Sequence, residues 1–108
     1  MLINNIEQLI GIITMAQRIC VFGAGLCARV VVRYLVENGL HHKLYCITVT
    51  SMEGNPSDIL GVPVIPLYQL SQSDTDAIIV ATFQNLHESI MATLSDNSFT
   101  DVFLLGGK

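Results

Sequence analysis

The sequence predicts an α/β fold built on a doubly wound parallel sheet, and two patterns in the chain support this. Short runs of β-branched and apolar residues alternate with segments that have helical spacing. A glycine-rich turn directly follows the first of these runs. Strands separated by helices pair in parallel through right-handed crossovers. We therefore expect about five strands in the order 3-2-1-4-5, together with an extra N-terminal helix.

The first half of the chain supplies an expected helix, strand, helix and strand. Residues 3–16 carry apolar side chains at helical spacing, and 18–22 form a compact apolar run. A second helix is expected over 25–38, ended by Gly39 as the residue after its C-cap. The next expected strand, 43–49, alternates poorly, as is typical of a strand buried on both faces.

The second half of the chain continues the alternation after a polar loop. Pro63 confines a short expected strand over 62–65 to a sheet edge. The run 77–81 is the clearest strand, and 102–105 is the last. Between them we expect a helix that starts at Asn85 as N-cap and buries four apolar residues, Leu86, Ile90, Met91 and Leu94.

Composition indicates one acidic domain with a surface poor in charge. The chain has 108 residues, of which 51% are hydrophobic and only 13% are charged, and its net charge is −4. A typical chain has about 25% charged residues, so part of the exterior is expected to be covered by a second copy or a linked domain. No cluster of Lys and Arg is present, which argues against nucleic acid or an anionic membrane as partner.

The cysteines and the chain start predict a cytoplasmic protein. Cys20, Cys27 and Cys46 are odd in number and lack C-x-x-C spacing, as is typical of buried thiols in a reducing compartment. The N-terminus has no basic region of the kind that begins a signal peptide. No apolar run reaches the ~18–20 residues of a membrane span.

The segment 18–28 carries the strongest functional signal. It places an apolar strand against Gly-x-Gly-x-x-Ala and a following helix, the context expected of a dinucleotide-binding turn. Gly23 permits the tight turn, Gly25 lets the backbone approach a pyrophosphate, and Ala28 lets the helix pack closely on the sheet. Free amide groups at the helix start favour an anion. A strand–helix turn that binds nothing is the alternative.

In an open α/β sheet the ligand lies where the strand order reverses, beyond the carboxyl ends of the strands. Here this position falls between the strands 18–22 and 77–81. One expected wall consists of Gly23, Ala24, Gly25, Leu26 and Cys27. On the opposite wall, Thr82 would bind a phosphate or ribose, and Phe83 would contact a base or sugar. Helix capping by Thr82 and packing of Phe83 beneath the crevice are the alternatives.

The end of the second strand argues against an ordinary nicotinamide cofactor. NAD-binding domains place an acidic residue about 20 positions after the glycines, and NADP-binding ones an Arg nearby. This chain instead has Thr50 and Ser51 there, whose hydroxyls would meet a ribose or phosphate more weakly, and Glu53 falls in the loop beyond. The expected ligand is therefore a nucleotide-sugar or a dinucleotide, with standard NAD doubtful.

No catalytic or metal-binding set is expected from the sequence. His41 and His42 precede the second strand at the wrong edge of the sheet. His87, which follows the crevice, is expected as an exposed helix residue, with a general base as the alternative. Cys27 has no neighbouring His or Lys in the sequence and is interpreted as a small packing residue. The chain therefore looks like a binding domain whose chemistry lies elsewhere.

The pattern resembles a small Rossmann-like module of bacterial surface-polysaccharide proteins. The likeness covers about 18–105, through the glycine turn 21–25, the loop Asn-Pro-x-x-x-x-Gly-x-Pro-Val-x-x-Leu over 55–67, and the final segment from the strand 78–82 to Leu105. Related modules occur in sugar acyltransferases, in nucleotide-sugar dehydratases and with glycosyltransferases of lipopolysaccharide and capsule assembly. The resemblance implies nucleotide or nucleotide-sugar binding at the turn, with catalysis in another domain.

Three hypotheses arise for the chain, divided into a packing or oligomerisation helix over 1–17 and a nucleotide-binding domain over 18–108. The first is a nucleotide-sugar-binding module of polysaccharide synthesis, not catalytic alone. The second is a fragment of an NAD(P)-dependent oxidoreductase or epimerase. The third is a vestigial domain that serves to dimerise, and a homodimer or a linked catalytic domain is the expected partner.

Overall fold

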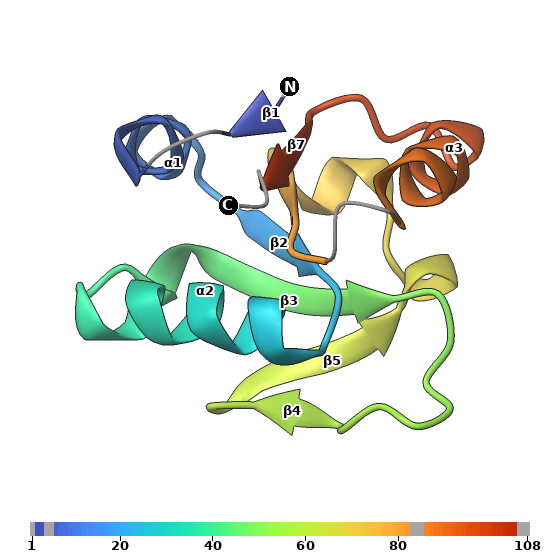
Figure 1. Ribbon diagram of the computed structural model, residues 1–108, viewed down its shortest axis with the longest axis horizontal. Coiled ribbons are helices and arrows are strands. Elements are labelled where there is room, and N and C mark those ends of the chain that lie inside the picture. The colour runs from blue at the N-terminus through green and yellow to red at the C-terminus, as the bar shows by residue number, and fades with distance from the viewer. Residues whose placement is uncertain (1, 4–5, 83–85, 106–108) are drawn as a thin grey trace.

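The computed structural model describes residues 2–3, 6–82 and 86–105 and confirms the α/β class. Six of its strands pair in parallel into one sheet, and a seventh adds antiparallel at one edge. Helices cover both faces of this sheet (Figure 1). The strands are β1 (Leu2–Ile3), β2 (Ile19–Phe22), β3 (Leu44–Val49), β4 (Asp58–Ile59), β5 (Val62–Pro66), β6 (Ala77–Val80) and β7 (Val102–Leu105).

The sheet order is β1-β7-β6-β2-β3-β5-β4, which differs from the expected arrangement of about five strands. The difference lies at the two edges, where β1 pairs with β7 and β4 pairs with β5. Both additions are two-residue strands, too short to produce a periodic pattern in the sequence. Between them the strand order is β7-β6-β2-β3-β5, so the chain reverses direction across the sheet between β2 and β6.

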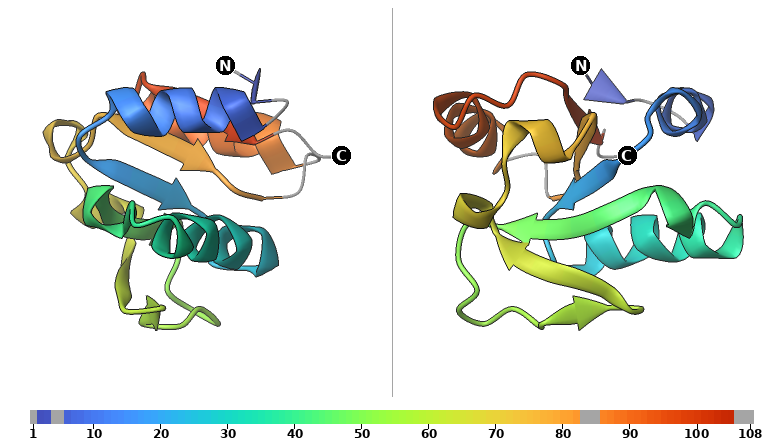
Figure 2. Two further views of the ribbon diagram at one scale, coloured as in Figure 1. Left: turned by 90° about the vertical axis from the view of Figure 1, so that its left-hand side faces the viewer. Right: turned by 180° about the vertical axis from the view of Figure 1, so that it is seen from behind.

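Two helices pack on one face of the sheet and one on the other (Figures 1 and 2). Buried residues of α1 (Ile6–Met15) and α2 (Leu26–Glu37) belong to one core cluster, and those of α3 (His87–Asp96) to a second. The described residues also include short 3-10 helices, among them η1 (His41–Lys43), η2 (Leu67–Gln69) and η3 (Gln72–Asp74).

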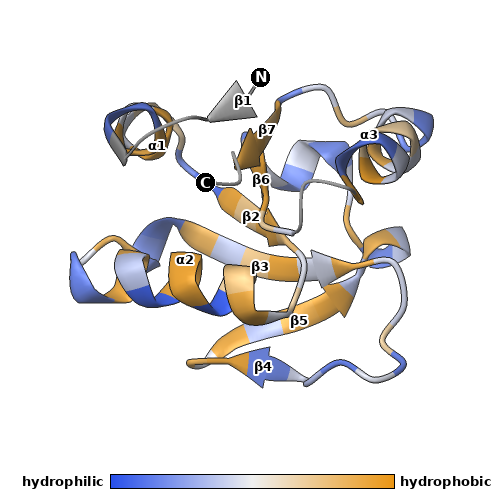
Figure 3. Cartoon of the chain, in the orientation of Figure 1, coloured by the Kyte–Doolittle hydropathy of each residue, from blue (hydrophilic) through white to orange (hydrophobic). Residues whose placement is uncertain are grey.

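The central strands are buried on both faces, which explains their almost continuous apolar sequence (Figure 3). Along β2, Ile19 and Val21 face α1 and α2, whereas Cys20 and Phe22 face α3. This alternation divides the core into two layers with β2 at the centre. The turn after β2 is therefore fixed by a strand that is itself fully enclosed.

The N-terminal segment differs from the helix expected over 3–16. Residues 2–3 form β1, and α1 begins only at Ile6. Three residues of this segment, Leu9, Ile13 and Ala16, lie in the same core cluster as the inner face of α2. The segment is thus packed into the main core of the domain.

Two further details correct the sequence analysis. The strand with Pro63 is not the edge of the sheet, because β4 pairs with it there. Proline is accommodated because its position faces Asp58 of the short β4 and takes no part in the ladder with β3. The last helix has Leu86 as N-cap, without a side-chain capping bond, instead of Asn85, which lies outside the described residues.

Candidate functional site

The turn after β2 has the geometry expected of a tight strand-to-helix connection. Gly23 adopts a φ of +114°, a conformation that side-chain-bearing residues rarely adopt. A Cβ at Gly23 would lie 2.9 Å from Cγ2 of Thr82 and 3.0 Å from the carbonyl oxygen of Ala81. Its own N–H donates to the carbonyl oxygen of Thr48 at 2.9 Å. The glycine is therefore required by the protein itself, independently of any ligand.

Gly25 has no such internal requirement. Its φ of −91° is open to any residue, and a Cβ built there would have no atom within 4 Å. Gly25 is the N-cap of α2, and it has no side chain with which to cap the helix. The first backbone bond of the helix runs from the N–H of Arg29 to the carbonyl oxygen of Gly25. The N–H groups of residues 26–28 precede that bond and have no acceptor within the helix.

The electrostatics of this helix start favour a negative charge. The first turn of α2 contains no acidic residue that would oppose an anion. The unsatisfied amides and the helix dipole together place partial positive charge at this end. The turn can therefore receive the oxygens of a phosphate or carboxylate without a competing side chain.

A cavity of about 230 Å³ opens over this turn. It lies between the start of α2 and the carboxyl end of β6, where the strand order reverses, as the sequence analysis expected. Five of its lining residues were predicted from the glycine pattern and one from the end of β6. The lining is Gly23, Ala24, Gly25, Leu26, Cys27, Ala81, Thr82 and Leu86.

The remaining predicted site residues lie apart from this cavity or outside the described chain. Thr50 and Ser51 are exposed in the turn after β3 and are not among the lining residues. Ser51 is engaged locally, since its hydroxyl accepts from the N–H of Glu53 and its carbonyl from the side chain of Asn55. Phe83 lies outside the described residues.

Two residues near the start of α3 have the opposite burial to that expected from the sequence. Leu86, expected on the buried face of the helix, is 44% exposed and lines the cavity. His87, expected at the surface, is buried, and its Nε2 has no hydrogen-bond partner among the described residues. Leu86 is the N-cap of α3 and precedes its first turn, whereas His87 is the first residue of the helix. No pattern in the sequence indicated this shift.

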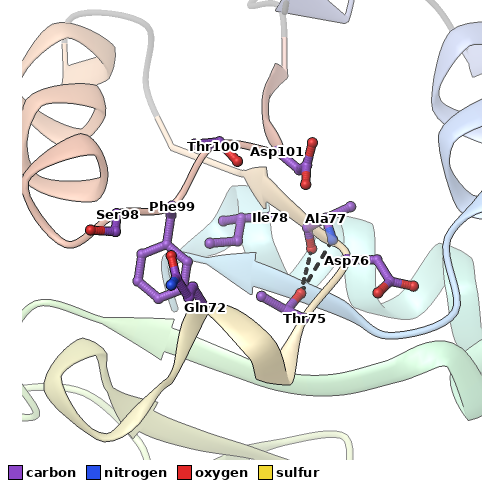
Figure 4. A pocket seen from close by; sticks show the side chains of 9 residues that line it. All are labelled: Gln72, Thr75, Asp76, Ala77, Ile78, Ser98, Phe99, Thr100 and Asp101. Carbon is purple, nitrogen blue, oxygen red and sulfur yellow. Dashed lines mark hydrogen bonds between the residues drawn. The ribbon is translucent and has the colours of Figure 1, made fainter.

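A second cavity lies at the opposite, amino edge of the sheet (Figure 4). Its volume is about 110 Å³, and the side chains of Phe99, Thr75 and Asp76 are among those that line it. The hydroxyl of Thr75 bonds the backbone of Ala77, which fixes the start of β6. Its lining includes no glycine and no start of an α-helix, only the first residue of the short η3, Gln72, so the site at the carboxyl edge is the stronger candidate.

Within the ranges that the structure describes, no group of three or more His, Cys, Asp or Glu side chains could hold a metal ion. Over the same ranges, no helix is both long and apolar enough to cross a membrane. No protein-family model, curated protein or solved structure matches the chain.

Proposed function

We propose that this chain is a Rossmann-like domain that binds a nucleotide or nucleotide-sugar at the turn between β2 and α2. The observation that carries the proposal is Gly25, which neither its φ nor its packing requires to be glycine. Its missing side chain keeps open the cavity over the start of α2. A diphosphate placed there would accept from the amides at residues 26–28, and backbone without a Cβ allows that approach.

The nature of the ligand is inferred from the residues that follow β3. Thr50 and Ser51 stand in the sequence where an NAD site has an acidic residue, and neither lines the cavity. This composition favours a ligand held mainly through its phosphates over an ordinary nicotinamide cofactor. A fragment of an NAD(P)-dependent oxidoreductase or epimerase remains the alternative, and submillimolar affinity for NADH in a calorimetric titration would favour it.

The biological setting that we propose rests on the resemblance of the sequence to polysaccharide-synthesis modules. A nucleotide-sugar module of lipopolysaccharide or capsule synthesis would bind the activated sugar, and a separate domain would carry the reaction. The cytoplasm, where nucleotide-sugars are made and used, is the compartment that this role requires. The chain's own part would be to hold the diphosphate.

Thermal unfolding in the presence of UDP-, GDP- and CDP-sugars tests the proposal. A ligand at 100 times its Kd stabilises the folded chain by ~2.7 kcal/mol, which for about 100 residues raises the midpoint by several degrees. We expect such a rise with at least one nucleotide-sugar and a smaller one with the matching nucleoside monophosphate. If neither these compounds nor NADH raised the midpoint, the result would contradict the proposal.

A specific surface supports a second role, dimerisation through α2. Leu26 is 73% and Val30 62% exposed, and they lie in a shallow groove of about 390 Å³ on the outer side of the helix. Arg29 and Arg33 border this groove, with Glu37 at its far end. In an antiparallel pair of α2 helices that sets Glu37 of each copy opposite Arg29 of the other, Val30 lies opposite Val36, and opposite charges flank these apolar contacts. Arg33 then lies at the two-fold axis, where its long side chain can extend into solvent. We propose a second copy of this chain as the occupant.

Val30→Glu is expected to convert the dimer into a monomer. The substitution places one charge per copy in the apolar contact between Val30 and Val36, where that charge would be desolvated. Sedimentation velocity at micromolar concentration should show a dimer for the unchanged chain and for Val30→Leu, but a monomer for Val30→Glu. An unchanged chain that sediments only as a monomer would rule out this interface.

A further inference from the structure

Two of the three thiols touch each other inside the sheet. Cys20 on β2 and Cys46 on β3 are register partners on neighbouring parallel strands, and their Sγ atoms lie 3.3 Å apart. Both side chains face the α3 side of the sheet, and they are 0% and 2% exposed, respectively. Cys27 is half-buried and packs against the opposite core cluster, so the sheet separates it from this pair.

The contact makes the two thiols chemically unequal. With Cys46 as donor, the S–H···S hydrogen bond lowers the pKa of Cys20, an effect that burial partly opposes. The same bond raises the pKa of Cys46, and burial adds to this effect. Cys20 is therefore the better thiolate of the two, and Cys46 holds the proton beside it.

We propose that Cys20 and Cys46 form a dithiol site that a low-molecular-weight disulfide, such as oxidised glutathione, converts into an intramolecular disulfide. The Cys20 thiolate attacks one glutathione sulfur and releases a glutathione thiolate. Cys46, on losing its proton, then attacks Cys20 of the mixed disulfide and releases the second glutathione. The two cysteines lose two electrons, and the two glutathiones leave with those electrons and the two protons.

The strand geometry can accept the resulting bond. Adjacent strands lie about 4.8 Å apart, which is within the range of Cα separations, about 4.4–6.8 Å, that disulfides span. The sulfurs, now 3.3 Å apart, must approach to about 2.05 Å, which side-chain rotation can supply. The bond would link β2 and β3, 26 residues apart in sequence, within three residues of Gly23. This site is independent of the proposed nucleotide site.

Because both thiols are buried, glutathione reaches them only when the sheet opens locally, so the proposal is best tested at equilibrium. We would use Cys27→Ser, which retains only the pair, and measure the disulfide-to-dithiol ratio in glutathione buffers by alkylation and mass spectrometry. Equilibrium would be approached from the oxidised and the reduced protein. If the fold holds the two thiols in position to bond, the disulfide-to-dithiol ratio should be about 100-fold higher in native buffer than in concentrated urea. This factor is equivalent to ~2.7 kcal/mol.

Cys20→Ser is the matched control, because it leaves Cys27 and Cys46 on opposite faces of the sheet. Its ratio should be no higher in native buffer than in urea. Circular dichroism would confirm that both redox forms are folded. If Cys27→Ser failed to fold, the same ratio would be measured on the unchanged chain, with the bonded pair located by peptide fragmentation. The proposal would be overturned if the disulfide-to-dithiol ratio of Cys20 and Cys46 in native buffer were no higher than in urea.

Discussion

Gly25→Leu is expected to weaken nucleotide-sugar binding by at least about 100-fold while leaving the domain folded. The position accepts a side chain, since its φ is −91° and no atom lies within 4 Å of a Cβ built there. That side chain would extend over the cavity at the start of α2 and occupy the space intended for a diphosphate. The loss corresponds to about 2.7 kcal/mol of binding free energy. Isothermal titration with the nucleotide-sugar that stabilises the unchanged chain measures it.

Gly25→Ala serves as the graded control for this prediction. A single methyl group should reduce affinity less than the leucine does, and both variants should have the far-ultraviolet circular dichroism spectrum of the unchanged chain. Full affinity in folded Gly25→Leu would place the ligand elsewhere. It would also favour the vestigial, dimerising domain over the binding module.

Gly23→Ala is expected to destabilise the fold by about 3 kcal/mol. The new methyl group would combine a strained φ of +114° with contacts of 2.9 Å and 3.0 Å to Thr82 and Ala81. A positive φ alone costs about 1–2 kcal/mol for a residue with a side chain, and the forced contacts add to it. Because Gly23 joins β2 to α2 and bonds the carbonyl of Thr48, the strain cannot be relieved without moving the sheet. Urea unfolding measures the difference.

Two other glycines separate the causes of that loss. Gly39→Ala introduces a methyl group at φ +69° into open space. It should therefore lower the free energy of unfolding only through backbone strain, by about 1 kcal/mol. Gly25→Ala has neither a positive φ nor a close neighbour, and its effect should stay within about 0.5 kcal/mol. If Gly23→Ala and Gly39→Ala destabilised the fold equally, Ala81 and Thr82 would have moved to make room for the new methyl group.

The α/β class and the internal strands could be predicted because strands buried on both faces have continuous apolar sequences. Runs such as 77–81 are apolar on both faces, and Gly39 ends its helix at a φ of +69°, as expected of the residue after a C-cap. The edge strands β1 and β4 could not be predicted, because two residues form no pattern and their pairing depends on distant partners, β7 and β5. Pro63 was misleading for the same reason.

The geometry of the candidate site was predictable where it depends on backbone, and less so where it depends on side chains. Glycine spacing predicted a tight turn at Gly23, which its φ of +114° confirms, and open space above Gly25, where a Cβ would meet no atom within 4 Å. Leu86 and His87 exchanged their expected burial, because α3 begins one residue later than the sequence pattern predicted and leaves Leu86 as the N-cap. Thr50 and Ser51 follow the expected strand but lie beyond the cavity lining.

The amide resonances of Leu26, Cys27 and Ala28 provide the most direct test of the claim that the start of α2 binds a diphosphate. In a ¹H–¹⁵N correlation spectrum, titration with UDP should shift these three resonances in a saturable way. UMP should shift them less at equal concentration, since it lacks the second phosphate. Shifts confined to other parts of the chain, or none at millimolar UDP, would contradict the account.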